Sequence, residues 1–251
     1  MADTNPELMQ TIKQRLEIIQ ANVTSAAEES DRSPSEVLIL AVSKRQPVGV
    51  IEAAYDCGLR SFGENYAEEA SEKIDQLAHL TDIHWEMVGH VQSRKAGSVA
   101  ANFSRMHSLD SLKLARRLDT ARSSQASTPP LEVLLQLNVS GEESKEGLPA
   151  WERNQWEQLL PIISEILPLS HLRLTGLMTM PPLFDDPELS RPFFQRLRQV
   201  RDYLNQQITG LQLTELSMGT SSDYFVAVEE GATIIRIGQA LLGPRINRSE
   251  N

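Results

Sequence analysis

The sequence predicts an α/β fold of the (β/α)8 barrel type, the TIM barrel. Short apolar segments alternate with helical patterns along the chain, which is typical of parallel βαβ units. Eight such segments follow one another between Leu38 and Ile237, which is the strand number of this barrel. An open doubly wound sheet is the alternative, but it usually has fewer strands. No Pro/Gly/Ser-rich linker divides the chain, so we expect one domain over residues 1–251.

Composition and charge limit the classes of function. Hydrophobic residues make up 40% and charged residues 23%, an ordinary globular mixture. The formal net charge of −10 argues against nucleic acid or an anionic membrane as the main partner. No apolar stretch approaches the roughly 20 residues that span a bilayer, and no secretory signal precedes the first helix. Cys57 is the only cysteine, so no intrachain disulfide is possible, and we expect a cytoplasmic protein.

The first elements come from periodicity and turn residues. Residues 6–30 carry apolar side chains at spacings of three and four, which predicts an additional N-terminal amphipathic helix. Residues 38–42 form an unbroken apolar run, typical of a strand buried on both faces. A helix over 47–57 follows, with Pro47 near its first turn and Gly58 just past its end.

The same unit then repeats to the end of the chain. The predicted strands are 59–62, 83–88, 105–107, 131–139, 172–177, 211–216 and 233–237. The predicted helices are one ending at 77, then 95–101, one ending near 121, 151–167, 187–206 and a short one after 223. A polar or glycine-containing loop follows each strand, as the barrel requires.

In such a barrel the active site lies at the carboxyl ends of the strands. Polar residues fall there in strand after strand: Lys44, Asn65, His90, His107, Asn138, Ser217 to Ser222, Arg236 and Gly238. Each alone has a structural explanation. A single histidine is more often a satisfied structural residue, and Asn138 could cap a strand end. Their common position at one rim favours a functional site.

Lys44 directly follows the first strand. A lysine is almost never fully buried without a partner. Its stem could extend along the strand end to place the charge in water. Alternatively, a desolvated amine could attack a carbonyl group and form a Schiff base.

Two loops near the end of the chain have the composition of an anion site. The segment from Ser217 to Asp223 combines glycine, hydroxyl groups and a helix start, and Gly238-Gln239 follows the next strand. Phosphate sites in these barrels often use the loops after strands seven and eight. Ser221 or Ser222 could instead only cap the helix. Arg236 stands in an apolar strand, and if it faces inward its charge needs a partner.

These segments together resemble the pyridoxal-phosphate homeostasis proteins (the YggS/PROSC family), above all the cyanobacterial members. The resemblance runs in order over residues 38–245. The matching segments are Ala41–Lys44, Phe62–Tyr66, Val88–Lys95, His107–Asp110, Leu137–Glu142, Gly176–Met178, Leu216–Gly219, Ser221 with Asp223, and Ile235–Gly238. The chain departs from the family at Glu86, where histidine is usual, and at Thr220, where methionine is common.

The resemblance implies a barrel like the N-terminal domain of alanine racemase (PLP fold type III). It implies pyridoxal 5′-phosphate (PLP) bound as a Schiff base on Lys44, with Arg236 facing the pyridine nitrogen. No metal is expected. The other cofactor-binding residues that it implies are Asn65, His107, Asn138, Met178, Ser217, Gly219, Thr220, Ser221, Gly238 and Gln239.

Three functions remain open at this point. The chain could carry PLP within intracellular vitamin B6 homeostasis, act as a PLP enzyme of the racemase type, or be an aldolase-type barrel without a cofactor. About a dozen residues follow the last strand, so we expect no second domain to supply an opposing acid or base. We therefore expect a monomeric carrier without evident turnover, with apo PLP-dependent enzymes as recipients.

Overall fold

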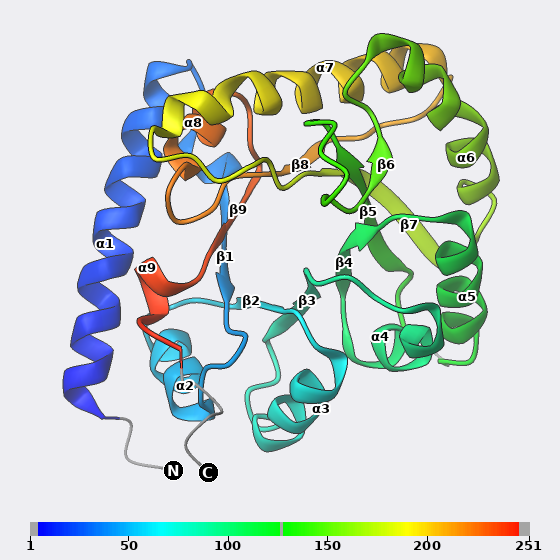
Figure 1. Ribbon diagram of the computed structural model, residues 1–251. Coiled ribbons are helices and arrows are strands. Elements are labelled where there is room, and N and C mark those ends of the chain that lie inside the picture. The colour runs from blue at the N-terminus through cyan, green and yellow to red at the C-terminus, as the bar shows by residue number, and fades with distance from the viewer. Residues whose placement is uncertain (1–4, 126–127, 246–251) are drawn as a thin grey trace.

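The protein is described here by a computed structural model, which covers residues 5–125 and 128–245. Strands alternate with helices along the chain (Figure 1). The strands are β1 (Leu38–Val42), β2 (Ser61–Glu64), β3 (His84–Met87), β4 (Arg105–Leu109), β5 (Leu131–Asn138), β6 (Leu148–Pro149), β7 (Leu172–Met178), β8 (Glu215–Ser217) and β9 (Ile234–Ile237). The helices are α1 (Pro6–Glu29), α2 (Val48–Asp56), α3 (Ala67–Gln76), α4 (Ala96–Asn102), α5 (Leu112–Ser123), α6 (Leu159–Ile166), α7 (Arg191–Gln207), α8 (Tyr224–Glu229) and α9 (Gln239–Leu242).

The strands close into a barrel. Each strand pairs in parallel with its neighbours from β1 to β5 and from β5 through β7 and β8 to β9. The last strand returns to the first, where Arg236 of β9 lies beside Leu40 of β1. Within the described residues, eight parallel strands thus form the predicted (β/α)8 barrel. The two-residue β6, which the sequence analysis did not predict, pairs only with the end of β5.

Apolar side chains form two separate clusters because successive residues of a strand point to opposite faces. The large cluster packs the strands against the surrounding helices and includes Phe62 and Phe194. The small cluster consists of Leu40, Leu134, Met178 and Ile234. Ile234 lies on the same face of β9 as Arg236, and Leu40 pairs with Arg236 across the strands. The small cluster therefore fills only part of the barrel interior.

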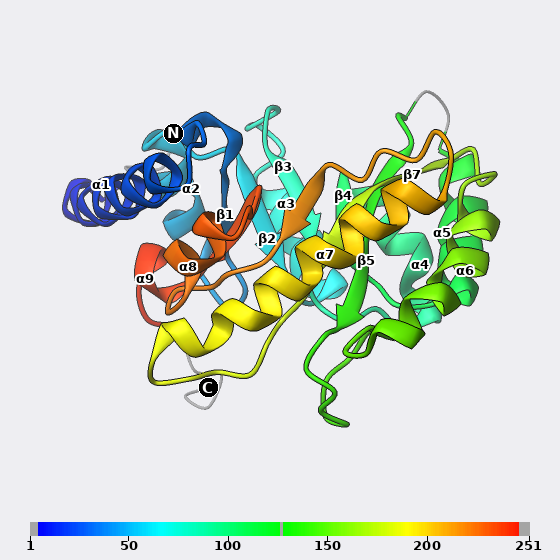
Figure 2. The same cartoon turned by 90° about the horizontal axis from the view of Figure 1, so that it is seen from above.

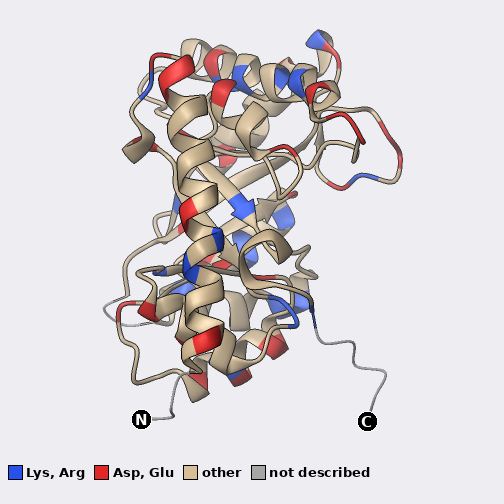
Figure 3. Ribbon diagram, turned by 90° about the vertical axis from the view of Figure 1, so that its left-hand side faces the viewer, with Lys and Arg blue, Asp and Glu red and all other residues tan. Residues whose placement is uncertain are grey.

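The N-terminal helix α1 covers the seam where the last strand pairs with the first. It packs against α2, which follows the first strand, and against α8 and α9, which flank the last strand. Seen from above, α1 lies with these helices at one end of the molecule, while α5 and α6 lie at the other (Figure 2). Both acidic and basic residues are marked on the ribbon along α1 and the helices beside it (Figure 3).

The predicted helix over 151–167 is divided in the structure. A 3-10 helix covers Arg153–Gln158, and α6 begins only at Leu159. Pro161 explains the division, since proline is tolerated in the first turn of a helix but disrupts a helix interior. None of the helices in the described residues has the length and apolar composition needed to cross a bilayer.

Candidate functional site

A cavity of about 440 Å³ lies where the carboxyl ends of β1, β2, β8 and β9 meet. Its walls combine charged, hydroxyl and apolar side chains. The lining residues are Val42, Lys44, Asn65, Val88, Met180, Leu183, Thr220, Ser221, Ser222, Arg236, Gly238, Gln239 and Arg245. The volume lies within the range of about 300–1,000 Å³ that is common for small-molecule sites.

Lys44 lies in a tight turn directly after β1. The backbone of Arg45 is left-handed, with φ of 57°, and its N–H donates to Glu69 Oε1 at 2.6 Å. The Ser43 carbonyl accepts from Lys73 Nζ at 2.7 Å. Because both partners come from α3, this helix holds the turn that presents Lys44 to the cavity.

A buried ion pair supports this turn from the outer face of the barrel. Lys73 Nζ lies 2.7 Å from Glu64 Oε1, and the two side chains are 7% and 0% exposed. The Ser43 hydroxyl donates to the same oxygen at 2.7 Å. Burial raises the pKa of the Glu64 carboxyl, although the charge of Lys73 opposes this shift. The removal of one member of such a pair is strongly destabilising, so the turn depends on both Glu64 and Lys73.

The Lys44 amine is poised for nucleophilic chemistry. Burial lowers its pKa from the usual 10.5, and the positive charges of Arg245 and Arg45 lower it further, against the opposing effect of Glu64 and Glu69. A lower pKa raises the fraction of neutral amine, which is the form that attacks a carbonyl. Arg245 lines the same cavity, and sequence reasoning missed it because no motif surrounds it.

Arg236 points into the barrel, which settles the orientation that the sequence left open. Its side chain lies in the cavity wall and is 5% exposed. One nitrogen donates to Ser217 Oγ at 2.6 Å and another donates to the Thr179 carbonyl at 2.8 Å. Burial lowers the pKa of the guanidinium to about 10. Arg236 is therefore a cation at neutral pH, with its position fixed by two acceptors.

The two predicted anion loops lie on one side of the cavity. Gly219 adopts φ of 89°, and a Cβ there would lie 2.6 Å from the Ala227 Cβ, so this turn requires glycine. The Thr220 backbone N–H and hydroxyl both donate to Asp223 Oδ1, at 2.7 and 3.1 Å. The next residues, Ser221 and Ser222, line the cavity with Gly238 and Gln239. These groups are the available donors for an anion.

The structure divides the predicted site residues into two groups. Seven line the cavity: Lys44, Asn65, Thr220, Ser221, Arg236, Gly238 and Gln239. Five lie outside its lining: His107, Asn138, Met178, Ser217 and Gly219.

Each residue of the second group has a structural partner. Met178 belongs to the apolar cluster inside the barrel, and His107 and Ser217 are hydrogen-bonded to each other at 2.8 Å. Asn138 accepts from the Gly141 N–H at 3.0 Å and donates to the Glu142 carbonyl at 2.9 Å, which orders the loop after β5.

Comparison with known proteins gives one consistent family. Residues 15–245 match the model of the alanine racemase N-terminal domain. The chain is 41% identical to the pyridoxal phosphate homeostasis protein of Pseudomonas aeruginosa, over 94% of this chain and 97% of that protein. It is 36% identical to the protein of the same name from Escherichia coli, over 94% and 98%. The chain belongs to the pyridoxal phosphate homeostasis protein family.

Solved structures agree with this family assignment. PipY of Synechococcus elongatus, solved with PLP bound, is 36% identical and has a TM-score of 0.76, over 92% of this chain and all of PipY. An alanine racemase of Clostridium difficile has a TM-score of 0.67 at 14% identity, over 95% of this chain and 58% of that chain. The second likeness shows the fold alone. The pyridoxal phosphate homeostasis family therefore shares the barrel that racemases also use.

Proposed function

We propose that this chain binds PLP in the cavity, as a Schiff base on Lys44, and serves the intracellular homeostasis of vitamin B6 and the linked balance of amino and keto acids. The observation that carries the proposal is the convergence of Lys44, Arg236 and the two hydroxyl and glycine loops on one cavity. The names of the relatives and the PLP in PipY support it.

The residues of the cavity match the chemistry of PLP, a planar aromatic aldehyde with a phosphate group. Val42, Val88 and Met180 offer apolar surface for a ring. Arg236 offers a fixed donor for the ring nitrogen. A phosphate group would be held by donors from the other cavity residues: Ser221, Ser222, the backbone of Gly238 and Gln239, and Arg245. When bound, PLP supplies an aldehyde and an electron-accepting ring.

Arg236 argues for a carrier rather than an efficient enzyme. A permanent cation that donates to the ring nitrogen leaves that nitrogen unprotonated, which weakens the ring as an electron acceptor. Proton transfer on both faces of a substrate carbon also needs two groups within hydrogen-bond reach. Within the described residues, the nearby candidates for the second acid or base are Tyr66, His90 and His107. None of them lines the cavity. His107 is fully buried, and His90 Nδ1 lies 3.1 Å from Asp110 Oδ2.

Lys44→Ala and Lys44→Arg should both lose the visible absorption of the bound cofactor. Neither variant carries an amine that forms the Schiff base, although arginine keeps the positive charge. Weak binding through the phosphate loops should persist. Absorbance spectra after PLP addition test this. In the wild type, mass spectrometry after borohydride reduction should find the cofactor on the peptide that contains Lys44.

Lys113→Ala, at an exposed position on α5, is the control and should keep the wild-type spectrum. A Lys44→Ala protein as yellow as the wild type would remove Lys44 from the proposal. The carrier function is tested by incubation of the loaded protein with an apo PLP-dependent enzyme and, separately, with amino acids. Transfer without an amino-acid product supports a carrier, whereas turnover at about 1 per second or faster supports the racemase-type enzyme.

A further inference from the structure

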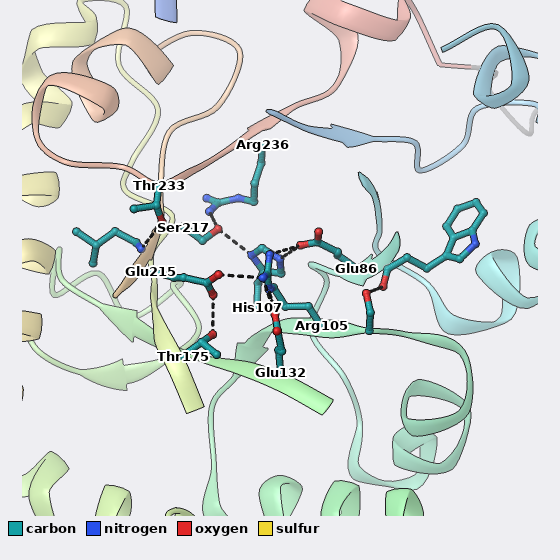
Figure 4. A network of polar contacts seen from close by, with 12 residues as sticks. Glu86, Arg105, His107, Glu132, Thr175, Glu215, Ser217, Thr233 and Arg236 are labelled. Atoms are coloured by element: carbon teal, nitrogen blue, oxygen red, sulfur yellow. Dashed lines mark hydrogen bonds and ion pairs between the residues drawn. The ribbon is translucent and has the colours of Figure 1, made fainter. Parts of the chain in front are cut away.

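A continuous line of hydrogen bonds runs from the cavity into the barrel interior (Figure 4). Arg236 contacts Ser217 Oγ at 2.6 Å, and Ser217 Oγ lies 2.8 Å from His107 Nδ1. His107 Nε2 lies 2.7 Å from Glu86 Oε2. These four residues come from β9, β8, β4 and β3, so the line connects strands on opposite sides of the barrel.

All four side chains are buried, and Arg236 is the only one of them that lines the cavity. Ser217 and His107 are 0% exposed, and Glu86 is 2% exposed. Glu86 is also within 3.4 Å of Arg105, which contacts Glu132 and Glu215 nearer the opposite end of the barrel. The polar atoms of the line are therefore shielded from bulk solvent and are paired with protein groups.

The chemistry of the groups fixes the direction of every hydrogen bond. An ionised carboxylate only accepts, so Glu86 requires the proton of His107 to be on Nε2. Burial lowers the pKa of His107, so the ring is neutral and its Nδ1 can only accept. The Ser217 hydroxyl must then donate to Nδ1, and its oxygen accepts from Arg236, which has donors alone.

The line also connects two charges that do not touch. No carboxylate among the described residues forms an ion pair with Arg236, whose side chain donates to a hydroxyl and to a backbone carbonyl. Burial would raise the pKa of Glu86, but its interactions with His107 first, and then with Arg105 and Ser61, outweigh this effect and lower that pKa. Hydrogen bonds that point in the same direction polarise one another, so the negative charge of Glu86 favours the cation at Arg236.

We propose that Glu86 is a positioning residue, which fixes the Nε2–H tautomer of His107 and, through Ser217, the orientation of Arg236 in the cavity wall. The consequence for cofactor binding rests on the proposed function, because Arg236 is there the donor to the ring nitrogen. Without the carboxylate, the His107 proton can move to Nδ1. The Ser217 oxygen then receives two donors, and the line loses its single direction.

Nitrogen NMR of the histidine rings, recorded without added cofactor, tests the first part. The chain has five histidines, so His107 can be assigned by single replacement. We expect the Nε2–H tautomer in the wild type at neutral pH and a detectable Nδ1–H population in Glu86→Gln. Glu132→Gln is the matched control, because Glu132 contacts Arg105 and Arg173 but not His107, and it should leave the tautomer unchanged.

PLP affinity, measured by equilibrium dialysis, tests the second part. Glu86→Gln should weaken binding by about three- to tenfold, as expected for one weakened hydrogen bond, and Glu132→Gln should not. Ser217→Ala should weaken binding while His107 keeps its Nε2–H tautomer. If Glu86→Gln fails to fold, wild-type affinity in Ser217→Ala would overturn the proposed link from His107 to Arg236.

Two results would overturn the proposal: an imidazolium or an Nδ1–H tautomer at His107 in the wild type, or wild-type tautomer and affinity in a folded Glu86→Gln protein. The failure of PLP to bind the wild type would refute the proposed function instead. The tautomer measurement would then still decide the positioning role of Glu86, since it needs no cofactor.

Discussion

Arg245 lies among residues that the sequence assigned to the cofactor and contributes to their electrostatics. Its charge is the second largest cause, after burial, of the lowered pKa of Lys44. Gly243, with φ of 89°, turns the backbone after α9 and brings Arg245 to the cavity. Such a turn leaves no spacing pattern in the sequence. Lys44, in contrast, could be identified because it closely follows an apolar run.

Arg245→Gln should shift the formation of the Schiff base to higher pH. Loss of the positive charge raises the pKa of Lys44 and leaves less neutral amine at a given pH. PLP affinity should fall about tenfold or more, as for the loss of a charged hydrogen bond to phosphate. A titration of the visible absorbance against pH measures the first effect, and dialysis measures the second.

Arg245→Lys is the matched control, because it keeps the positive charge at this position. Its pH profile should stay close to that of the wild type. An unchanged profile and affinity in Arg245→Gln would show that Arg245 acts on neither Lys44 nor the phosphate.

At the level of the elements, the order of strands and helices was predictable, but several boundaries were not. The predicted strand 211–216 is only Glu215–Ser217 in the structure. Leu211 and Leu213 are buried in the large apolar cluster. Their apolar spacing therefore results from packing against the core and not from strand pairing. Similarly, β6 is a two-residue pairing with β5 and is too short for any periodicity to predict.

The helix α1 was predicted from its apolar spacing, but its role depends on tertiary contacts. Ile12 is 0% exposed, and α1 packs against the helices that flank the first and the last strand. Asn22 Nδ2 donates to the Tyr224 hydroxyl at 2.7 Å, which links α1 directly to α8. We therefore infer that α1 stabilises the seam where β9 meets β1.

Ile12→Ala should lower the free energy of unfolding by about 2–5 kcal/mol, the usual cost of a large-to-small change in a core. Ile18→Ala on the same helix is the control, since Ile18 is 62% exposed, and it should change stability by at most about 0.5 kcal/mol. Urea unfolding measures both. Equal effects of the two changes would refute the role of α1 at the seam.

At the scale of the whole molecule, the barrel interior differs from the usual stack of apolar layers. Among the described residues, a small apolar cluster fills part of the interior, and Glu86, Arg105, His107 and Glu215 occupy neighbouring positions. The sequence placed His107 at a strand end but could not pair it with Glu86, 21 residues away. That contact depends on the register between β3 and β4, where Glu86 lies beside Arg105.

This interior predicts that the protein loses stability as the pH falls. Burial lowers the pKa of His107 below its usual 6.5, so the unfolded chain binds a proton that the folded chain does not. Below pH 6.5, the free energy of unfolding must therefore decrease as the solution becomes more acidic. Glu86, whose folded-state pKa lies below its usual 4.5, adds a second loss once the pH falls below that value.

Urea unfolding between about pH 7 and pH 5 measures the contribution of His107. One proton corresponds to a slope of up to about 1.4 kcal/mol per pH unit. His107→Gln removes the titrating ring, so its unfolding free energy should change less steeply over this range. His84→Gln, at an exposed position of β3, should keep the wild-type slope. If His107→Gln also kept that slope, proton uptake at this buried ring would not be the cause of the acid sensitivity, and the neutral histidine inferred inside the barrel would be wrong.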